Sequence, residues 1–267
     1  MTRTRRFRLT IEFDGTHFRG WQWQPTGERT IQGELQRALA QLPGNHSAVH
    51  GAGRTDSGVH ALALPAHFDT DSRLDPEKLR LGLNAHLPAD VKVIGAEEAA
   101  PDFEAQYSCL YRRYVYRLRP VREAPRGLAL DRHRVLPVHW RPDVPAMREA
   151  AELLAGMHDF ASFATRETRS TVRTVLLSEL REEHGELRYH VAADGFLRNM
   201  IRTAVGTLLW VGRGKLAPED IPAVIAARDR TRAGHNVAPH GLYFVEAGYA
   251  PFERASSEAE TLRRLLF

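Results

Sequence analysis

A glycine-rich segment in the first quarter of the chain carries the residues best suited to chemistry. It reads Gly51-Ala52-Gly53-Arg54-Thr55-Asp56-Ser57-Gly58-Val59-His60. Glycines let a backbone turn tightly and approach a ligand closely, and here they accompany a guanidinium and a carboxylate, those of Arg54 and Asp56. Asp-Ser-Gly is also ordinary turn composition. By itself the segment therefore predicts a loop with two charged side chains and leaves its function open.

Other known site types fit the sequence less well. Asp56-Ser57-Gly58 matches the active-site tripeptide of aspartic proteases, but those enzymes use two such carboxylates after apolar strand residues, and here Arg54-Thr55 comes first and no second copy exists. A protease would have to dimerise across the site. Gly51-x-Gly53 has Asp56 where a dinucleotide fingerprint needs glycine or alanine. Gly212-Arg213-Gly214-Lys215 lacks the spacing and the Ser or Thr of a phosphate-binding P-loop.

Length and charge favour a globular protein with a polyanionic partner. The 267 residues, 43% of them hydrophobic, suffice for a substantial core in one large or two medium domains. The formal net charge is +4, the pI is about 9.4, and most cations are arginine. Because the arginine fork suits phosphate oxygens, this composition favours a partner such as nucleic acid.

The cysteine and histidine patterns indicate a cytoplasmic protein without a metal. Cys109 is the single cysteine, so neither an intrachain disulfide nor a cysteine-rich zinc site can form. His46 and His50 lie four apart but have no acidic or cysteine partner at metal-site spacing. The basic N-terminal segment lacks the apolar core of a signal peptide, and no apolar run approaches the ~20 residues that span a bilayer.

The elements that position the glycine-rich loop form an α+β pattern. Phe7, Leu9, Ile11 and Phe13 alternate with polar residues and predict a half-buried strand. Thr30 is a candidate N-cap for the next helix, and Asp75 for a second one. The first hundred residues thus predict strand, helix, strand, loop, strand, helix, strand, with the later strands at 47–50, 61–68 and 91–94.

A second α+β unit is predicted from about residue 103. In the strand 112–119, Tyr114 shares one face with Tyr116 and Leu118, while arginines dominate the other face. Residues 121–141 are rich in Pro and Arg and predict an irregular connection. A helix from Asp143 to Gly156, strands at 171–180 and 187–193 joined by a turn at 182–185, a helix at 197–210, a short helix after Pro218 and a final strand at 242–245 complete this unit.

Three segments together resemble the TruA family of tRNA pseudouridine synthases. The loop matches that family's G-R-T-D-A-G-V-H signature at seven of eight positions, with Ser57 in place of alanine. Residues 112–116 resemble its R-R-Y-x-Y strand, and residues 196–202 its F-[LV]-x-x-M-[VI]-R segment. Supporting matches run in order over about residues 7 to 249, among them Glu12-x-Asp14-Gly15 and Gly20-Trp21-Gln22. Residues 234–239 depart from the family's usual A-G-P-T-A-P and leave substrate detail open.

The resemblance implies an enzyme that isomerises uridine to pseudouridine at positions 38 to 40 of the tRNA anticodon stem-loop, without a cofactor or metal. It implies that Asp56 is the catalytic carboxylate and that Arg202 is its ion-pair partner. Tyr114 would be the active-site tyrosine that stacks on the extruded uracil. Whether the carboxylate attacks the sugar or adds to the uracil ring stays open. Substrate-binding residues by the same resemblance are Arg54, Thr55, His60, Arg113, Tyr114 and Arg198.

The resemblance also implies an architecture and partners. We expect two RRM-like (ferredoxin-like) α+β domains, with antiparallel sheets flanked by helices and an active-site cleft between them. The expected boundaries are 1–104 for the N-terminal domain with the Asp56 loop, 105–250 for the C-terminal domain and 251–267 for a charged tail. A homodimer that binds tRNA across both subunits is implied as well. The alternative from another class is a non-catalytic tRNA-binding or chaperone protein of the same fold.

Overall fold

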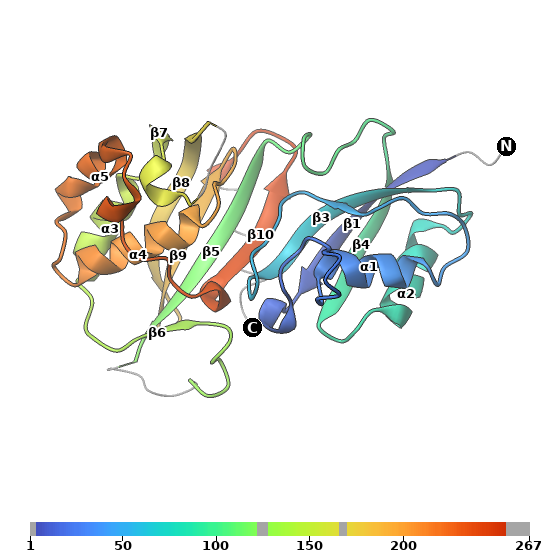
Figure 1. Cartoon of the computed structure of the whole chain (residues 1–267), viewed down its shortest axis with the longest axis horizontal. Coiled ribbons are helices and arrows are strands. Elements are labelled where there is room, and N and C mark those ends of the chain that lie inside the picture. Colours follow the sequence, from blue (N-terminus) through green and yellow to red (C-terminus); the bar gives the residue numbers. More distant parts are fainter. Residues whose placement is uncertain (1–3, 122–127, 166–169, 255–267) are drawn as a thin grey trace. The chain divides into compact units, whose positions relative to one another are not determined.

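The computed structural model describes residues 4–121, 128–165 and 170–254, which fall into two compact units (Figure 1). The first comprises the described residues up to Leu110 together with those from Tyr243 onward, and the second comprises those from Tyr111 to Leu242. Each unit combines strands with helices, so the predicted α+β class is confirmed. The domain boundaries at 104 and 250 stay predictions, because a division by packing does not test which segments fold independently.

The sheet of the first unit has the strand order β4-β1-β3-β10. Strand β1 is antiparallel to both of its neighbours, whereas β10 runs parallel to β3 and β2 pairs with the other end of β3. The pairing of β10 with β3 includes the final strand in the first unit, although its place in the sequence suggested the second. The strands are β1 (Arg5–Phe13), β2 (His50–Gly51), β3 (His60–Thr70), β4 (Val91–Ala99) and β10 (Leu242–Gly248).

The alternation predicted for β1 is confirmed by burial. Phe7, Leu9 and Ile11 are fully buried, and Phe13 is 3% exposed. Helices α1 (Ile31–Leu39) and α2 (Pro76–His86) pack side by side (Figure 1). Both predicted caps are present, because the Thr30 side chain accepts a hydrogen bond from the Gly33 amide and Asp75 accepts one from the Lys78 amide. Local sequence therefore sets where these helices begin.

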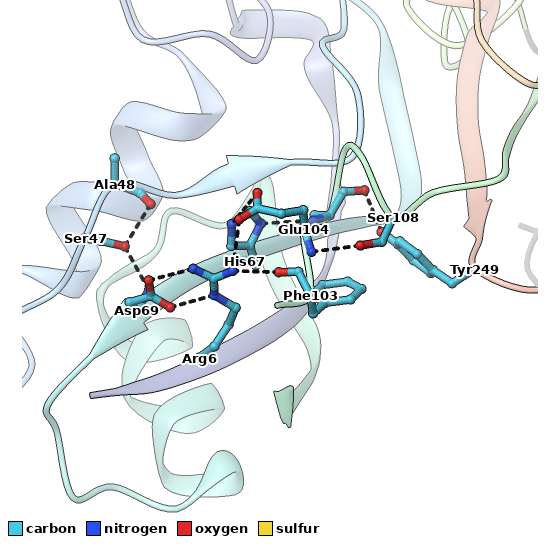
Figure 2. A network of polar contacts seen from close by, with 10 residues as sticks. Arg6, Ser47, Ala48, His67, Asp69, Phe103, Glu104, Ser108 and Tyr249 are labelled. Atoms are coloured by element: carbon cyan, nitrogen blue, oxygen red, sulfur yellow. Dashed lines mark hydrogen bonds and ion pairs between the residues drawn. The ribbon is translucent and has the colours of Figure 1, made fainter. Parts of the chain in front are cut away.

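A polar network fastens the chain after β4 to the sheet of the first unit (Figure 2). Arg6 donates to both carboxylate oxygens of Asp69, at 2.7 and 2.8 Å, and also to Glu104 at 2.9 Å. Glu104 in turn lies 3.2 Å from Nε2 of buried His67, and the Tyr249 hydroxyl donates to the Ala105 carbonyl. These contacts attach residues 103–105 and the segment after β10 to strands β1 and β3.

The second unit is built on the antiparallel strands β5, β9, β8 and β7 in that order, with β6 parallel to β5. Helix α3 packs on α4 and β8. The strands are β5 (Tyr111–Pro120), β6 (Leu136–Val138), β7 (Gly156–Asp159), β8 (Val172–Glu183) and β9 (Glu186–Ala193), and the helices are α3 (Val144–Glu152), α4 (Met200–Gly212) and α5 (Ile221–Ala227).

Three local predictions for the second unit are corrected. Strands β6 and β7 have three and four residues and no alternating pattern, so neither was predicted. The hairpin between β8 and β9 is tighter than expected, with only His184 and Gly185 at its tip. Both have positive φ, 53° and 75°, as a two-residue hairpin requires. Helix α4 begins at Met200 rather than Leu197, because Asn199 before it is left-handed.

One face of the second sheet carries a buried charge cluster. Glu186 on β9 is 3% exposed and accepts hydrogen bonds from Arg117, at 2.8 Å, and from Arg119, at 2.6 Å. Arg188 lies 3.3 Å away on the same strand. The arginine face predicted for β5 is thus present, and two of its arginines pair with Glu186 on the neighbouring strand. Burial raises the pKa of Glu186, yet the hydrogen bonds and charges of these arginines outweigh it and lower that pKa to about 2.

No helix among the described residues is both long and apolar enough to cross a bilayer.

Candidate active site

The loop that carries Asp56 is held by backbone contacts to residues 18–21. The Trp21 amide donates to the Thr55 carbonyl at 3.1 Å, and the Gly58 amide donates to the Phe18 carbonyl at 3.3 Å. The Ser57 hydroxyl donates to the same Phe18 carbonyl at 3.0 Å. The loop is thereby bonded on both sides of Asp56 through its neighbours Thr55, Ser57 and Gly58.

Two glycines make this close approach possible. A Cβ atom on Gly20 would lie 2.4 Å from the Thr55 carbonyl oxygen, and Gly20 has a φ of +90° that favours glycine. A Cβ atom on Gly15 would lie 1.9 Å from the Val59 carbonyl oxygen. Any other residue at either position would displace the backbone of the Asp56 loop.

The side chains of the loop differ in exposure. Arg54 is exposed, Asp56 is half-buried, and Thr55 is 8% exposed. The loop therefore presents its cation to solvent, while its carboxylate is partly withdrawn from water.

His60 lies beneath the loop in the core of the first unit. It is 3% exposed, and its ring stacks on Tyr243 of β10 with centroids 4.7 Å apart. Its Nδ1 is 3.1 Å from the Gly15 amide and 3.2 Å from Oδ1 of Asp14. A neutral His60 with its proton on Nε2 accepts from Gly15, whereas a proton on Nδ1 is donated to Asp14.

The environment of Asp14 favours its carboxylate. The hydrogen bond with His60 lowers the pKa of Asp14 far below its usual range, burial opposes this, and hydrogen bonds from Thr16 add to the lowering. These contacts attach the residues that follow β1 to the start of β3, the strand that comes directly after the Asp56 loop.

Tyr114 and the start of α4 lie together in the second unit. Tyr114 is 7% exposed, and the edge of its ring meets Phe196 at a centroid distance of 5.2 Å and an interplanar angle of 83°. This contact fixes the orientation of the tyrosine ring. The structure therefore joins the tyrosine strand to the segment that leads into the Arg202 helix, two regions far apart in sequence.

Arg202 is fixed in the first turn of α4. Its Nε donates to the Val237 carbonyl at 2.7 Å, and its Nη1 donates to the Asn199 side chain at 3.2 Å. The Tyr116 hydroxyl donates to the next carbonyl, that of Ala238, at 2.6 Å. Burial raises the pKa of Tyr116, and the charge of Arg202 opposes it only in part, so the phenol stays protonated as a donor.

The segment that departs from the TruA pattern packs tightly against α4. A Cβ atom on Gly234 would lie 2.2 Å from the backbone of Gly206, and one on Gly206 would lie 1.9 Å from the His235 carbonyl oxygen. Glycine at both positions lets this loop reach the helix and place the Val237 carbonyl beside Arg202.

The other two predicted contacts occupy different environments. Arg113 on β5 is 1% exposed, whereas Arg198 before α4 is exposed. Asp56, Arg54, Thr55 and His60 belong to the first unit, and Tyr114, Arg113, Arg198 and Arg202 to the second. Their catalytic and binding roles stay predictions.

The support of the Asp56 loop by residues 14–21 was missed at the sequence level. Asp14-Gly15 predicts the turn that ends the first strand, and the segment around Gly20-Trp21-Gln22 predicts an irregular stretch, but neither pattern indicates a contact with the Asp56 loop. Gly20 was the available signal, since a glycine that no turn motif explains often marks a close backbone approach.

Among the described residues, no three His, Cys, Asp or Glu side chains are grouped so as to hold a metal ion.

Comparison with known proteins identifies relatives along nearly the whole chain. Residues 9–108 and 150–250 match a family model described as tRNA pseudouridine synthase. A Thermus thermophilus protein named tRNA pseudouridine synthase A is 48% identical over 256 residues, which cover 94% of this chain and 99% of that protein. A protein of the same name from Chromobacterium violaceum is 44% identical, with 97% and 98% covered. One from Afipia carboxidovorans is 42% identical, with 91% and 99% covered. The chain therefore belongs to the tRNA pseudouridine synthase family.

Proposed function

We propose that this protein converts uridine to pseudouridine in the anticodon stem-loop of tRNA, at positions 38 to 40, with Asp56 as the catalytic carboxylate. The observation that carries the proposal is the half-buried Asp56 on a loop bonded to Phe18 and Trp21 by backbone atoms. The reaction breaks the bond between N1 of uracil and C1′ of ribose and forms one between C5 and C1′. C5 loses a proton and N1 gains one, so no net oxidation occurs and no co-reactant is consumed.

A carboxylate suits this chemistry because it can stabilise or trap an electron-deficient sugar carbon, or add to the uracil ring. In a site closed by a flipped-out base, a neighbouring cation keeps such a carboxylate ionised. We assign this role to Arg202. In support, its guanidinium donates hydrogen bonds to the Val237 carbonyl and to the Asn199 side chain. These two contacts fix the direction of the guanidinium.

Tyr114 is proposed to stack on the extruded uracil and to place its hydroxyl near the proton that leaves C5. Its support is the fixed ring orientation against Phe196. Exposed Arg54 is proposed to contact the phosphate backbone and to help displace the base. Arg198, Arg113, Thr55 and His60 are proposed as further contributors to the substrate site.

The tRNA substrate follows from the family, and recognition of a folded RNA by shape and backbone agrees with an arginine-rich chain of pI about 9.4. We further propose that the protein acts in the cytoplasm as a homodimer, with tRNA bound across both subunits.

The decisive experiment incubates the purified protein with unmodified tRNA in the presence of a chelator and maps pseudouridine along the RNA. We expect product at positions 38 to 40, and none in a matched tRNA with cytidine at these positions. A protein that binds the tRNA but forms no pseudouridine at any position would overturn the enzymatic proposal in favour of a non-catalytic tRNA-binding protein.

Gly20→Ala is expected to lower the single-turnover rate of pseudouridine formation by about 10²-fold, the scale of a displacement near 1 Å at a reacting group. The added Cβ would collide with the Thr55 carbonyl, whose contact with Trp21 supports the Asp56 loop. Single-turnover kinetics with saturating enzyme measure the effect.

Gly27→Ala is the matched control. Gly27 also has a positive φ, +76°, but nothing lies within 4 Å of a Cβ built there. This variant should lose about 1 to 2 kcal/mol of stability and keep the wild-type rate. Equal rates for the two variants would show that the close contact of Gly20 does not position the loop.

A further inference from the structure

A basic pocket with two tryptophans lies at the C-terminal end of α4, within the second unit. It has a volume of about 280 Å³, and apolar residues 136–138 and Leu209 line it together with Trp140, Trp210, Arg213, Lys215 and His235. Both indoles are half-buried, and the three basic residues are exposed. The volume lies just below the usual range of small-molecule sites, about 300–1,000 Å³, so the pocket suits a single ring system better than a whole cofactor.

The charge of this pocket is uncompensated within the described part of the chain. Its lining contains no carboxylate, and no ion pair there involves Arg213 or Lys215. The Arg213 guanidinium instead lies 5.7 Å from the centre of the Trp140 ring. An exposed arginine over an indole, with a lysine in the same lining, suits a nucleotide. The base can stack on the aromatic and guanidinium groups, and the two cations can neutralise the phosphate.

The end of α4 does not itself explain these cations. Lysine and arginine often occur at helix C-termini, where they compensate unbonded carbonyls. Here the Trp210 carbonyl already accepts from the Lys215 amide at 2.9 Å, and the Val211 carbonyl accepts from the Gly214 amide at 2.8 Å. The side chains of Arg213 and Lys215 are therefore not needed to bond these two carbonyls.

We propose that this tryptophan–arginine pocket binds one nucleotide of the tRNA substrate outside the region that reacts. The inference rests on the proposed function for its RNA ligand. Arg213 is eleven positions after Arg202, or about 16 Å along the helix axis at 1.5 Å per residue. A contact at this distance from Arg202 does not touch the group that we assign to the reaction, so we expect its loss to act on tRNA binding.

The test compares Arg213→Gln/Lys215→Gln with the wild type, using the full chain and unmodified tRNA. Glutamine keeps much of the aliphatic stem that packs on Trp140 and removes the charge. We expect the Kd for tRNA to rise at least about tenfold and the slope of log Kd against log salt to fall by about 1 to 2, as expected for two lost phosphate contacts. The single-turnover rate at saturating enzyme should not change. Trp140→Leu should raise Kd about 5- to 100-fold without changing the salt slope.

The matched control, Arg73→Gln/Lys92→Gln, removes two exposed cations from the first unit. If it weakens tRNA binding as much as the pocket variant does, only net charge matters and the pocket proposal is overturned. Unchanged binding by both Trp140→Leu and the pocket double variant would also overturn it. If the wild type binds tRNA but forms no pseudouridine, the proposed function fails, and the comparison of the two double variants still decides the pocket.

Discussion

Asp56→Asn is expected to abolish pseudouridine formation, lowering the single-turnover rate by at least about 10⁴-fold, the scale seen when a group of a catalytic constellation is removed. Asparagine has nearly the same shape but no negative charge to attack or stabilise the reacting carbon. The Kd for tRNA should stay within about threefold of the wild type, because the backbone contacts from Phe18 and Trp21 that hold the loop are the same in both proteins. Rates are measured with saturating enzyme and affinities by filter binding.

Ser57→Ala is the control for this substitution. Ser57 is the adjacent residue, is exposed, and contributes one hydroxyl hydrogen bond to the Phe18 carbonyl. The family signature has alanine at this position, so the rate should stay within about threefold of the wild type. Normal turnover by Asp56→Asn would rule out Asp56 as the catalytic carboxylate.

Glu186→Gln is expected to lower the free energy of unfolding by about 3 to 5 kcal/mol, because it removes the negative charge from between buried arginines. Glu186 is 3% exposed, and the side chains of Arg117, Arg119 and Arg188 are 10%, 14% and 5% exposed. Water therefore cannot readily replace the lost carboxylate. Denaturant unfolding near neutral pH, followed by far-ultraviolet circular dichroism, measures the change.

The pH dependence of stability provides a second measurement of the same cluster. The pKa of Glu186 is about 2 in the folded state, against an ordinary value of 4.5. The lowered pKa means that its contribution is complete above about pH 4.5 and is lost as the pH falls toward 2. Glu186→Gln should thus flatten the acid side of the stability profile.

Glu182→Gln on β8 is the matched control for Glu186→Gln. Its carboxylate is 63% exposed and lies 3.3 Å from Arg148, so its loss should cost less than about 1 kcal/mol. Equal losses for the two variants would contradict the assignment of Glu186 as the anion that the buried cluster requires.

The sequence was most informative where local chemistry decides the structure. The period of two in Phe7, Leu9, Ile11 and Phe13 predicted a strand with one buried face, and those side chains are buried. Thr30 and Asp75 predicted where two helices begin, since a capping side chain acts within three residues of its own position. The glycine-rich segment predicted a loop over residues 51–60, and residues 52–59 lie between the strands; Gly51 instead ends β2, and Gly58 has a positive φ of 80°.

Contacts between distant segments could not be predicted in this way. The arginines of β5 indicated a basic face, but only the register that brings Glu186 beside β5 shows that Arg117 and Arg119 share a buried carboxylate. His60 suggested a substrate contact by its place in a motif, while its stacking on Tyr243 depends on a strand more than 180 positions later. The arrangement of Asp56, Tyr114 and Arg202 as one site likewise stays a prediction.

The pairing of β10 with β3 has a consequence for the order of events during synthesis. Residues 60 and 61 lie beside residues 243 and 244 in parallel strands, and the Tyr243 ring covers His60. A chain emerging from the ribosome makes the Asp56 loop early but lacks this neighbour until some 180 further residues have been added. The first unit therefore completes its sheet only late in translation, after every described element of the second unit has been synthesised.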